Sequence, residues 1–293
     1  MGLGEFFALA SALCWAVAVI MLRRFATHMP ALELNLFKNP LSLLLVLVTI
    51  ALWQGIDLPY YENHELLIVF MSGFLGIAIA DTVYFQALRI MGASRTGIVS
   101  TLYTPFVLVL SAVFLSESLV FQQWLGFLLV SAGIVFVSVQ RARSEVSASE
   151  IRKGSLLAMA AMASMAVGIV MVKEILEERS FLWTMELRIL GGWVGMILIV
   201  TVRSQWRRVI TTYRQPHRWS MIILASILAG YLGFIFWLAG YKMLPASVAA
   251  ILNETNNAFI VLLAWWVLGE PVNSRKLMGL GLTLLGVMLM LSG

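Results

Sequence analysis

Residues 93–139 read ASRTGIVSTLYTPFVLVLSAVFLSESLVFQQWLGFLLVSAGIVFVSV, and a related stretch, ASVAAILNETNNAFIVLLAWWVLGEPVNSRKLMGLGLTLLGVMLMLS, fills residues 246–292. The two align without a gap at a constant offset of 153 residues. Each copy has the pattern of an apolar helix, a short acidic turn and a second apolar helix. Such a repeated hairpin indicates an internally duplicated protein. The landmarks that coincide are Ala93 with Ala246, Ser94 with Ser247, Glu117 with Glu270, Gly126 with Gly279, and Gly133 with Gly286.

The composition indicates that lipid, not water, surrounds this chain. Of its 293 residues, 61% are hydrophobic and only 12% are charged, and its mean hydropathy is +0.92. Soluble domains carry about 25% charged residues, so this chain cannot cover itself with a water-facing surface. Its net charge of +5 comes from basic residues in short loops beside apolar stretches, where they act as topology signals. We therefore expect the lipid bilayer as a partner and no nucleic acid.

Apolar stretches of about 20 residues, long enough to cross a hydrocarbon core, occur ten times. The longest polar break between them divides the chain into two halves of five. We predict a first five-helix repeat at 1–143, a polar linker at 144–153 and a second five-helix repeat at 154–293. The ten spans are expected at 5–22, 32–52, 66–88, 95–115, 119–140, 154–172, 181–202, 219–241, 246–268 and 275–292.

The odd number of spans in each half has a geometric consequence. The second half must enter the membrane from the side opposite to the first, so the halves form an inverted repeat. The predicted fold class is therefore an all-α integral membrane protein with ten transmembrane helices in two inverted five-helix repeats. Fifteen of the 20 lysines and arginines fall in loops on one side, against Lys173, Arg179 and Lys242 on the other. The positive-inside rule then places both termini outside the cytoplasm.

Asp81 is an ionisable residue about two-thirds of the way through the third span. A charge inside a membrane span is costly unless it is paired or hydrated, so such a residue calls for a partner or a function. Tyr84 follows at i+3 and shares its helical face. We interpret Asp81 either as a carboxylate that binds substrate or protons, or as a buried partner of Lys38 or Arg188.

Glu254 lies in LNETNNAF, the most polar run inside any predicted span. Asn253, Asn256 and Asn257 accompany it, and such a group must line a watery cavity or bond to neighbouring helices. The equivalent segment of the first half, STLYTPF, carries the milder polar residue Tyr103. Interrupted polar helices at matching places in two halves are typical of a binding site. We expect the substrate to lie against this segment, with interhelical hydrogen bonding as the alternative.

Lys38 and Arg188 occupy equivalent places in the second helix of each half. They could attract an anionic group of a substrate, pair with Asp81, Glu186 or Glu254, or snorkel to the interface. Aromatic residues recur at helical spacing on the eighth span and could form a wall for a planar ligand, although helix packing and an interfacial belt also explain them. They are Tyr231, Phe234, Trp237 and Tyr241, of which we select Trp237 as the candidate ligand contact.

Several landmarks of the repeat are expected to serve the architecture. Glu117 and Glu270 fall in turns near the start of the next helix, where the helix dipole favours a carboxylate. Glu186 is expected near the membrane interface. Glycines are expected where helices pack closely; these are Gly126, Gly133, Gly279, Gly281 and Gly286, with Gly191 and Gly195 as a GxxxG pair.

The hairpin ends FLSESLVFQQWLGFLLVSAG (114–133) and VLGEPVNSRKLMGLGLTLLG (267–286), with a basic residue in the second helix of each half, resemble the EamA-type ten-helix members of the drug/metabolite transporter superfamily. The resemblance covers both repeats. It implies a secondary transporter of small metabolites, with spans 5 and 10 outside the cavity or at a dimer contact. Members of this superfamily more often have cytoplasmic termini, in contrast to the distribution of basic residues here.

The predicted function is transport, by alternating access, of a small polar metabolite such as an amino acid, with export as the expected direction and proton coupling as the candidate driving force. Alternatives are broad efflux of cationic drugs, and a membrane accessory or lipid-handling subunit that transports nothing. An enzyme is not expected, because no nucleophile–base constellation or metal-ligand cluster stands out, and neither catalytic residues, metal nor cofactor is predicted. We expect a multi-pass protein of a cell membrane, such as a bacterial inner membrane, with a homodimer as the candidate assembly.

Overall fold

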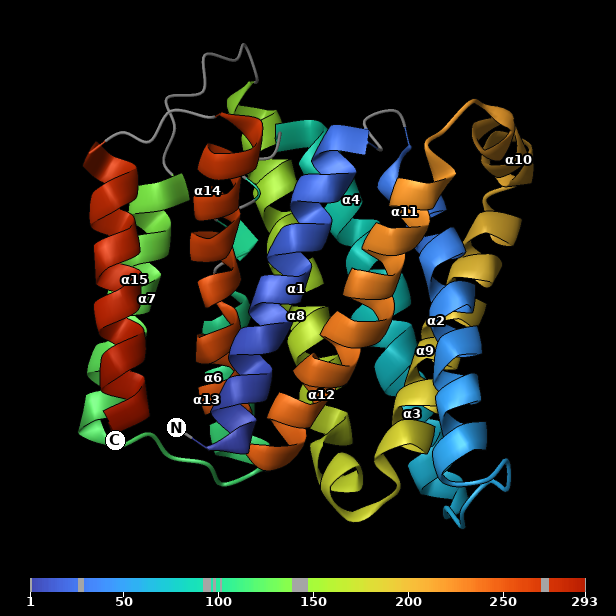
Figure 1. The fold of residues 1–293 in the computed structure, drawn as a ribbon, viewed down its shortest axis with the longest axis horizontal. Helices are drawn as coiled ribbons and strands as arrows, with labels where there is room; N and C mark the ends of the chain where they lie inside the picture. Colours follow the sequence, from blue (N-terminus) through green and yellow to red (C-terminus); the bar gives the residue numbers. More distant parts are fainter. Residues whose placement is uncertain are drawn as a thin grey trace.

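The computed structural model describes residues 2–25, 29–91, 96, 99–100, 102–138, 147–269 and 274–292, and within them the chain forms helices and no strand. The helices run up and down side by side, and both ends of the chain lie at the same end of the bundle (Figure 1). The elements are α1 (Leu3–Phe25), α2 (Ala31–Trp53), α3 (Asn63–Gly73), η1 (Phe74–Ile79), α4 (Ala80–Met91), α6 (Tyr103–Phe114), α7 (Phe121–Ser138), α8 (Ala148–Glu178), α9 (Phe181–Val202), α10 (Trp206–Arg214), α11 (Trp219–Ser226), η2 (Ile227–Leu232), α12 (Gly233–Met243), α13 (Ala246–Asn253), α14 (Thr255–Leu268) and α15 (Ser274–Ser292).

Seven helical stretches of the described chain are long and apolar enough to cross a membrane. They comprise α1, α2, α8, α9 and three stretches in which short helices follow one another, such as α11, η2 and α12. Helix α6 and residues 277–289 of α15 are apolar but shorter. The chain is therefore an all-helical membrane protein, and the count of ten spans remains a prediction.

Helix α8 begins earlier than its apolar stretch. Ser147 accepts a hydrogen bond from the Glu150 amide, and the Glu150 side chain accepts one from the Ser147 amide, so the two form a capping box. This arrangement satisfies amides at the start of the helix. As a result, residues 148–153 of the predicted polar linker belong to a helix.

The third membrane stretch of each half contains one turn of π-helix. Segment η1 covers Phe74–Ile79 and η2 covers Ile227–Leu232, so both ends of the two segments differ by the same 153 residues that relate the repeated hairpins. Single π turns are rare and often mark functional positions. Their matching places show that the duplication extends to the local backbone geometry.

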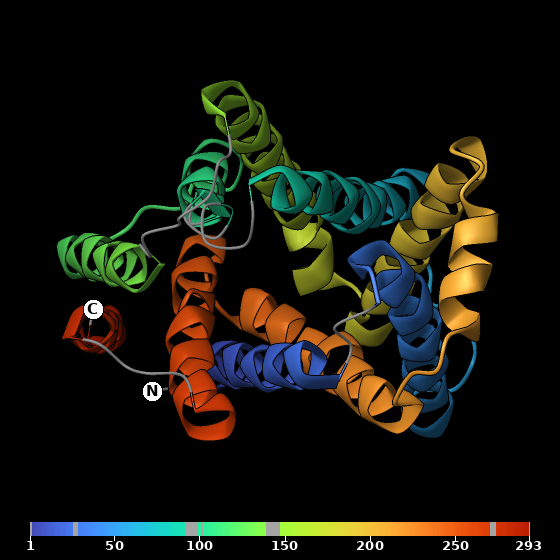
Figure 2. The same cartoon turned by 90° about the horizontal axis from the view of Figure 1, so that it is seen from above.

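The two halves interlock through these third stretches. Helix α4 and η1 pack against α8, and α12 and η2 pack against α1. Helix α9 lies along α3 and η1, and α2 lies against η2. Each half therefore inserts its third stretch between the first two helices of the other half, as the view down the bundle shows (Figure 2).

Glycines allow the closest of these contacts. A Cβ on Gly73 would overlap the carbonyl oxygen of Arg188, and a Cβ on Gly191 would overlap that of Phe70. A Cβ on Gly195 would lie 2.6 Å from the Phe74 ring. The predicted close-packing role of Gly191 and Gly195 is confirmed, because a larger residue would push α9 away from α3 and η1.

Helices α7 and α15 pack on each other at one edge of the bundle (Figure 2). A Cβ on Gly133 would lie 2.6 Å from the Gly279 carbonyl oxygen, and one on Gly286 would lie 2.7 Å from that of Gly126. The repeated glycines are thus the contact surface of this pair, as predicted. The prediction for Gly281 is wrong, since nothing lies within 4 Å of a Cβ built there; it stands on another face of α15.

Candidate functional site

Arg188 is held at the contact between α9, η1 and α8. Its side chain is buried, at 1% exposure, and Nη1 donates hydrogen bonds to the Gly168 carbonyl oxygen (2.8 Å) and to Ser72 Oγ (3.4 Å). A Cβ on Gly76 of η1 would lie 3.0 Å from Arg188 Nη2. Because glycine has no side chain, this position leaves room for the guanidinium. Snorkelling to the interface, one of the alternatives for this residue, is therefore wrong for Arg188.

Aromatic side chains cover the other side of the Arg188 guanidinium. Its Cζ lies 5.5 Å from the centre of the Trp237 ring, a favourable cation–π distance. The Trp237 ring lies 4.9 Å from that of Tyr241 and stacks at 5.4 Å on that of Phe234. The Tyr241 hydroxyl is 2.8 Å from the Tyr103 hydroxyl of α6. Three of the four aromatic residues predicted on the eighth span, Phe234, Trp237 and Tyr241, thus form a continuous row, which continues into the first half through Tyr103. The fourth, Tyr231, bonds instead through its hydroxyl to Thr49 Oγ1 of α2.

Glu254 occupies the break between α13 and α14. Its Oε1 accepts a hydrogen bond from Thr104 Oγ1 (2.8 Å), and Oε2 accepts one from Asn257 Nδ2 (3.2 Å). Thr104 and Asn257 are equivalent positions of the two repeats, at the offset of 153. The carboxylate therefore joins the two halves where the repeated segment changes from STLYTPF to LNETNNAF.

The three asparagines around Glu254 differ in their surroundings. Asn253 Nδ2 donates to the Ala249 carbonyl oxygen of its own helix (2.8 Å), and Asn257 Nδ2 donates to the Glu254 carboxylate. The Asn256 side-chain oxygen is buried and has no hydrogen-bond partner. Interhelical bonding thus explains part of this polar run, and Asn256 retains an acceptor without a protein partner.

Asp81 is the second residue of α4, in the first turn after η1. Its Oδ2 accepts a hydrogen bond from Asn35 Nδ2 of α2 (2.8 Å), and the carboxylate interacts electrostatically with Lys38. No salt bridge joins Asp81 and Lys38, both of which lie in the described part of α2 and α4. Tyr84, which was predicted to share a helical face with Asp81, forms a hydrogen bond with Ser100 and interacts electrostatically with the Asp81 carboxylate.

Lys38 mirrors Arg188 in position but not in bonding. Its stem crosses η2, where a Cβ on Gly230 would lie 2.8 Å from Lys38 Cγ, just as Arg188 crosses η1 at Gly76. Its ammonium group lies 5.2 Å from the centre of the Trp15 ring. Ser226, which precedes Gly230 by the same four positions that separate Ser72 from Gly76, is buried with its hydroxyl unpaired.

The predicted site residues therefore fall into two groups. The first contains Arg188, Trp237, Tyr241, Tyr103 and Glu254, which are linked by ring contacts, hydrogen bonds and electrostatic interactions. We call it the tyrosine group. The second contains Asp81, Asn35 and Lys38, and we call it the aspartate group. Each group combines one acidic and one basic residue, which lie on different helices of the same half of the chain.

Glu117 binds a helix of the opposite half. Its carboxylate accepts hydrogen bonds from the Ala246 amide (2.6 Å), the Ser247 amide (3.0 Å) and Ser247 Oγ (2.7 Å). The predicted interaction with a helix dipole is correct, but the helix is α13 and not the one that follows Glu117 in sequence. Glu270, the counterpart of Glu117, and Ala93 and Ser94, the counterparts of Ala246 and Ser247, lie outside the described residues.

Reasoning from the sequence missed several of these partners. Asn35 stands three positions before Lys38 on the same helix, and that spacing could have suggested it. Thr104 could have been found by aligning it with Asn257. Glu186, expected at the interface, is half-buried and has one carboxylate oxygen enclosed without a partner.

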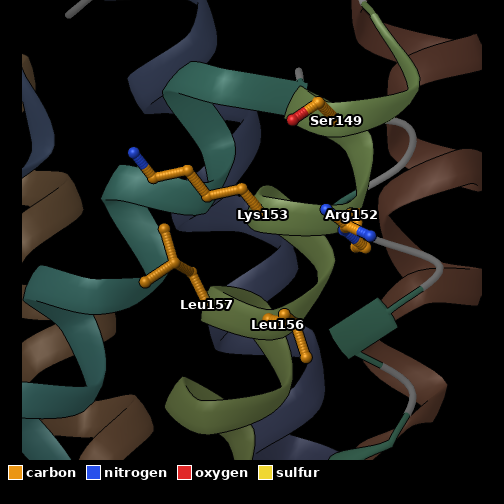
Figure 3. A pocket seen from close by; sticks show the side chains of 5 residues that line it. All are labelled: Ser149, Arg152, Lys153, Leu156 and Leu157. Carbon is orange, nitrogen blue, oxygen red and sulfur yellow. The ribbon is translucent and has the colours of Figure 1, made fainter.

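A separate hollow of about 370 Å³ lies at the start of α8 (Figure 3). It is lined by Ser149, Arg152, Lys153, Leu156 and Leu157. None of the predicted site residues reaches it, and its two cations are exposed. Within the described part of the chain, no three His, Cys, Asp or Glu side chains are placed to hold a metal ion.

A duplicated helical membrane bundle with acidic and basic side chains buried between its halves defines the class of polytopic membrane transporters. The chain belongs to the EamA-like transporter family, whose sequence model matches residues 2–139 and again 152–292. The predicted membership of the drug/metabolite transporter superfamily is confirmed, and the protein is a multi-pass protein of the cell membrane.

Individual relatives are distant. The uncharacterized transporter YetK of Bacillus subtilis (strain 168) is 19% identical over 84% of this chain and 73% of its own length. The uncharacterized transporter YyaM of the same organism is 19% identical over 85% of this chain and 80% of its own. A crystal structure of a protein 17% identical in sequence superposes with a TM-score of 0.79, covering 98% of this chain and 95% of that chain. This likeness establishes the fold alone.

Proposed function

We propose that this transporter exports a small polar metabolite, such as an amino acid or a related compound, by proton-coupled alternating access. The observation that carries the proposal is the bridge from Glu254 to Thr104, which joins the two halves through a carboxylate inside the bundle. A carboxylate in that place can release its proton when substrate arrives and recover it afterwards. Asp81 is the second candidate for this role.

The charges around the tyrosine group favour a zwitterionic substrate over a lipophilic cation. Arg188 lies over Trp237, so the aromatic face that would attract a cation already carries a positive charge. Glu254 supplies a negative charge at the other end of the row formed by Tyr103 and Tyr241. A molecule with one positive and one negative group matches both ends.

The inverted repeat supplies the mechanism. We take residues 1–143 and 154–293 as the two five-helix repeats, with ten spans in total and the polar linker between them. Exchange of the conformations of the two halves would close one end of the bundle and open the other. The end that carries the arginine-rich loops would face the cytoplasm, and both termini would lie outside. The outer pair of α7 and α15 is the surface that we propose for a homodimer.

The proposed function is tested with purified protein reconstituted in liposomes. Thermal unfolding across a panel of amino acids and related metabolites identifies ligands, because a ligand raises apparent stability with its occupancy. Uptake of each ligand is then measured with and without a pH gradient, beside tetraphenylphosphonium as a lipophilic cation. We expect gradient-dependent transport of a zwitterion. Transport of the lipophilic cation alone would favour drug efflux, and transport of neither would contradict the proposal.

A further inference from the structure

Helix α10 was not predicted from the sequence, and it lies across one end of the bundle. Figure 1 shows it nearly end-on, whereas Figure 2 shows it lengthwise along the edge of the molecule. Its axis is therefore roughly perpendicular to the membrane-spanning helices. A helix in this orientation at the end of a membrane bundle lies in the plane of the headgroups.

The inner face of α10 is fixed to the bundle. Val209 is 3% exposed and packs on the core. Arg208 Nε forms a salt bridge of 2.8 Å with Glu33 Oε1 of α2. The Tyr213 hydroxyl donates to the Glu33 carbonyl oxygen (2.7 Å). At the exposed start of α10, Trp206 Nε1 also donates to Thr201 Oγ1 of α9 (3.0 Å). These contacts hold the helix in one rotation about its axis.

That rotation determines what α10 presents outward. Trp206 is 40% exposed and Ile210 is 49% exposed, and they stand one turn apart on the same face. Arg207 and Arg214 are also exposed and stand two turns apart, beside this apolar strip. Neither of these two arginines has an ion-pair partner among the described residues.

The stretch from Arg203 to Arg218 contains five arginines and no aspartate or glutamate. Of the five, Arg208 is neutralised by the buried Glu33. An outward face with two cations and two apolar side chains is complementary to an anionic phospholipid, whose phosphate is charged and whose glycerol and acyl carbons are apolar.

We infer that α10 is a binding surface for anionic phospholipid headgroups, with Arg207 and Arg214 on the phosphates and Trp206 and Ile210 in the acyl boundary. This inference depends on the membrane fold and not on the proposed substrate or coupling. A lipid held there is linked through Arg208, Tyr213 and Glu33 to α2, the helix that carries Asn35 and Lys38.

The test uses the full-length protein in mild detergent, titrated with phosphatidylglycerol or with phosphatidylcholine while thermal unfolding is followed. The variant is Arg207→Gln/Arg214→Gln. The matched control is Arg152→Gln/Lys153→Gln, which removes two exposed cations from the hollow of Figure 3. Each surface cation near an anionic headgroup contributes about 1 kcal/mol, so the α10 variant should need about 30-fold more phosphatidylglycerol for the same stabilisation. The control should titrate like the wild type.

Two further arms decide the source of the phosphate and the role of the apolar strip. Inorganic phosphate should not reproduce the effect, and Trp206→Ser/Ile210→Ser should weaken the response to phosphatidylglycerol. The inference is overturned if phosphatidylglycerol and phosphatidylcholine stabilise the wild type equally. It is also overturned if the control variant loses as much of the stabilisation by phosphatidylglycerol as the α10 variant does. The attraction for anionic lipid would then be a diffuse property of the basic end of the bundle.

Discussion

Arg188 of α9 and Gly76 of η1 lie against each other across the boundary between the two halves of the chain, so closely that a Cβ on Gly76 would be 3.0 Å from Arg188 Nη2. Lys38 of α2 and Gly230 of η2 repeat this relationship with the halves exchanged. A basic residue of each half thus crosses the π turn of the other. Both cations lie over a tryptophan ring, Arg188 over Trp237 and Lys38 over Trp15. They differ in that Arg188 also donates hydrogen bonds to Gly168 and Ser72.

The close contact between α9 and the third stretch predicts that Gly73→Ala is strongly destabilising. The new methyl group would overlap the Arg188 carbonyl oxygen, and overpacking against backbone costs up to about 3 kcal/mol. Thermal unfolding in detergent measures the loss. Gly281→Ala is the matched control, because nothing lies within 4 Å of its Cβ; it should be neutral or slightly stabilising. Equal losses for the two variants would contradict this packing.

Glu117 is predicted to hold α13 in place. Glu117→Ala removes the acceptor of two backbone amides and of the Ser247 hydroxyl, and loss of such a cap costs about 1–2 kcal/mol. Glu117→Gln, which keeps an acceptor but loses the charge, should cost less. The melting temperatures should therefore rank wild type, Glu117→Gln and Glu117→Ala in descending order. Glu178→Ala, an exposed acid at the same end of the bundle, serves as control.

Two serines near the π turns predict opposite effects on the conformational equilibrium. Ser72, four residues before Gly76, accepts a hydrogen bond from Arg188, whereas Ser226, four residues before Gly230, is buried with its hydroxyl unpaired. If the halves exchange conformations, Ser226 becomes the partner of Lys38. Ser72→Ala should then depopulate the conformation described above, and Ser226→Ala should enrich it.

Distances between spin labels measure that shift. In a Cys14→Ser background, labels at Asp57 and Ser118 report on the end of the bundle that holds the termini, and labels at Ser149 and Arg207 report on the basic end. All four positions are exposed. A change in the same direction for both serine variants, or no change for either, would rule out the exchange.

Tyr213 predicts a stability change at alkaline pH. Burial, with a smaller contribution from the Glu33 charge, raises the pKa of Tyr213 to about 12 from its ordinary 10.0. Its contribution to stability is therefore complete below pH 10 and is lost as the pH rises through 12, because the unfolded chain releases the proton first. The difference in melting temperature between wild type and Tyr213→Phe should be constant up to pH 10 and shift against the wild type above it. A pH-independent difference would show that the phenol is not buried against α2.

Much of this fold follows from the sequence, for physical reasons. The apolar runs are helical because a backbone in lipid must satisfy its own hydrogen bonds. The repeated glycines Gly133 and Gly286 predict close helix packing because small residues permit it, although they do not show that α7 and α15 are each other's partners. Helix α10 was missed because it is short and polar, and its role depends on Glu33, which is remote in sequence.

The pairing of the buried charges could not be predicted in this way. Spacing places Asp81 and Glu254 in the membrane, but it does not show that Asp81 bonds to Asn35 or that Glu254 bonds to Thr104. Those contacts depend on how the halves interlock, and the π turns that shape the interlocking have no signal in hydrophobic periodicity. The same holds for Glu117, whose partner helix begins 129 residues later in the chain.

The central claim is that the Glu254 carboxylate couples the two halves during proton-linked transport. The most direct test compares wild type, Glu254→Gln and the exposed control Glu174→Gln in liposomes loaded with the ligand found by thermal stabilisation. Transport driven by a pH gradient and exchange without a gradient are measured in the same preparation. The account predicts that Glu254→Gln abolishes gradient-driven transport, while Glu174→Gln behaves like the wild type. Gradient-driven transport by Glu254→Gln at the wild-type rate would contradict it.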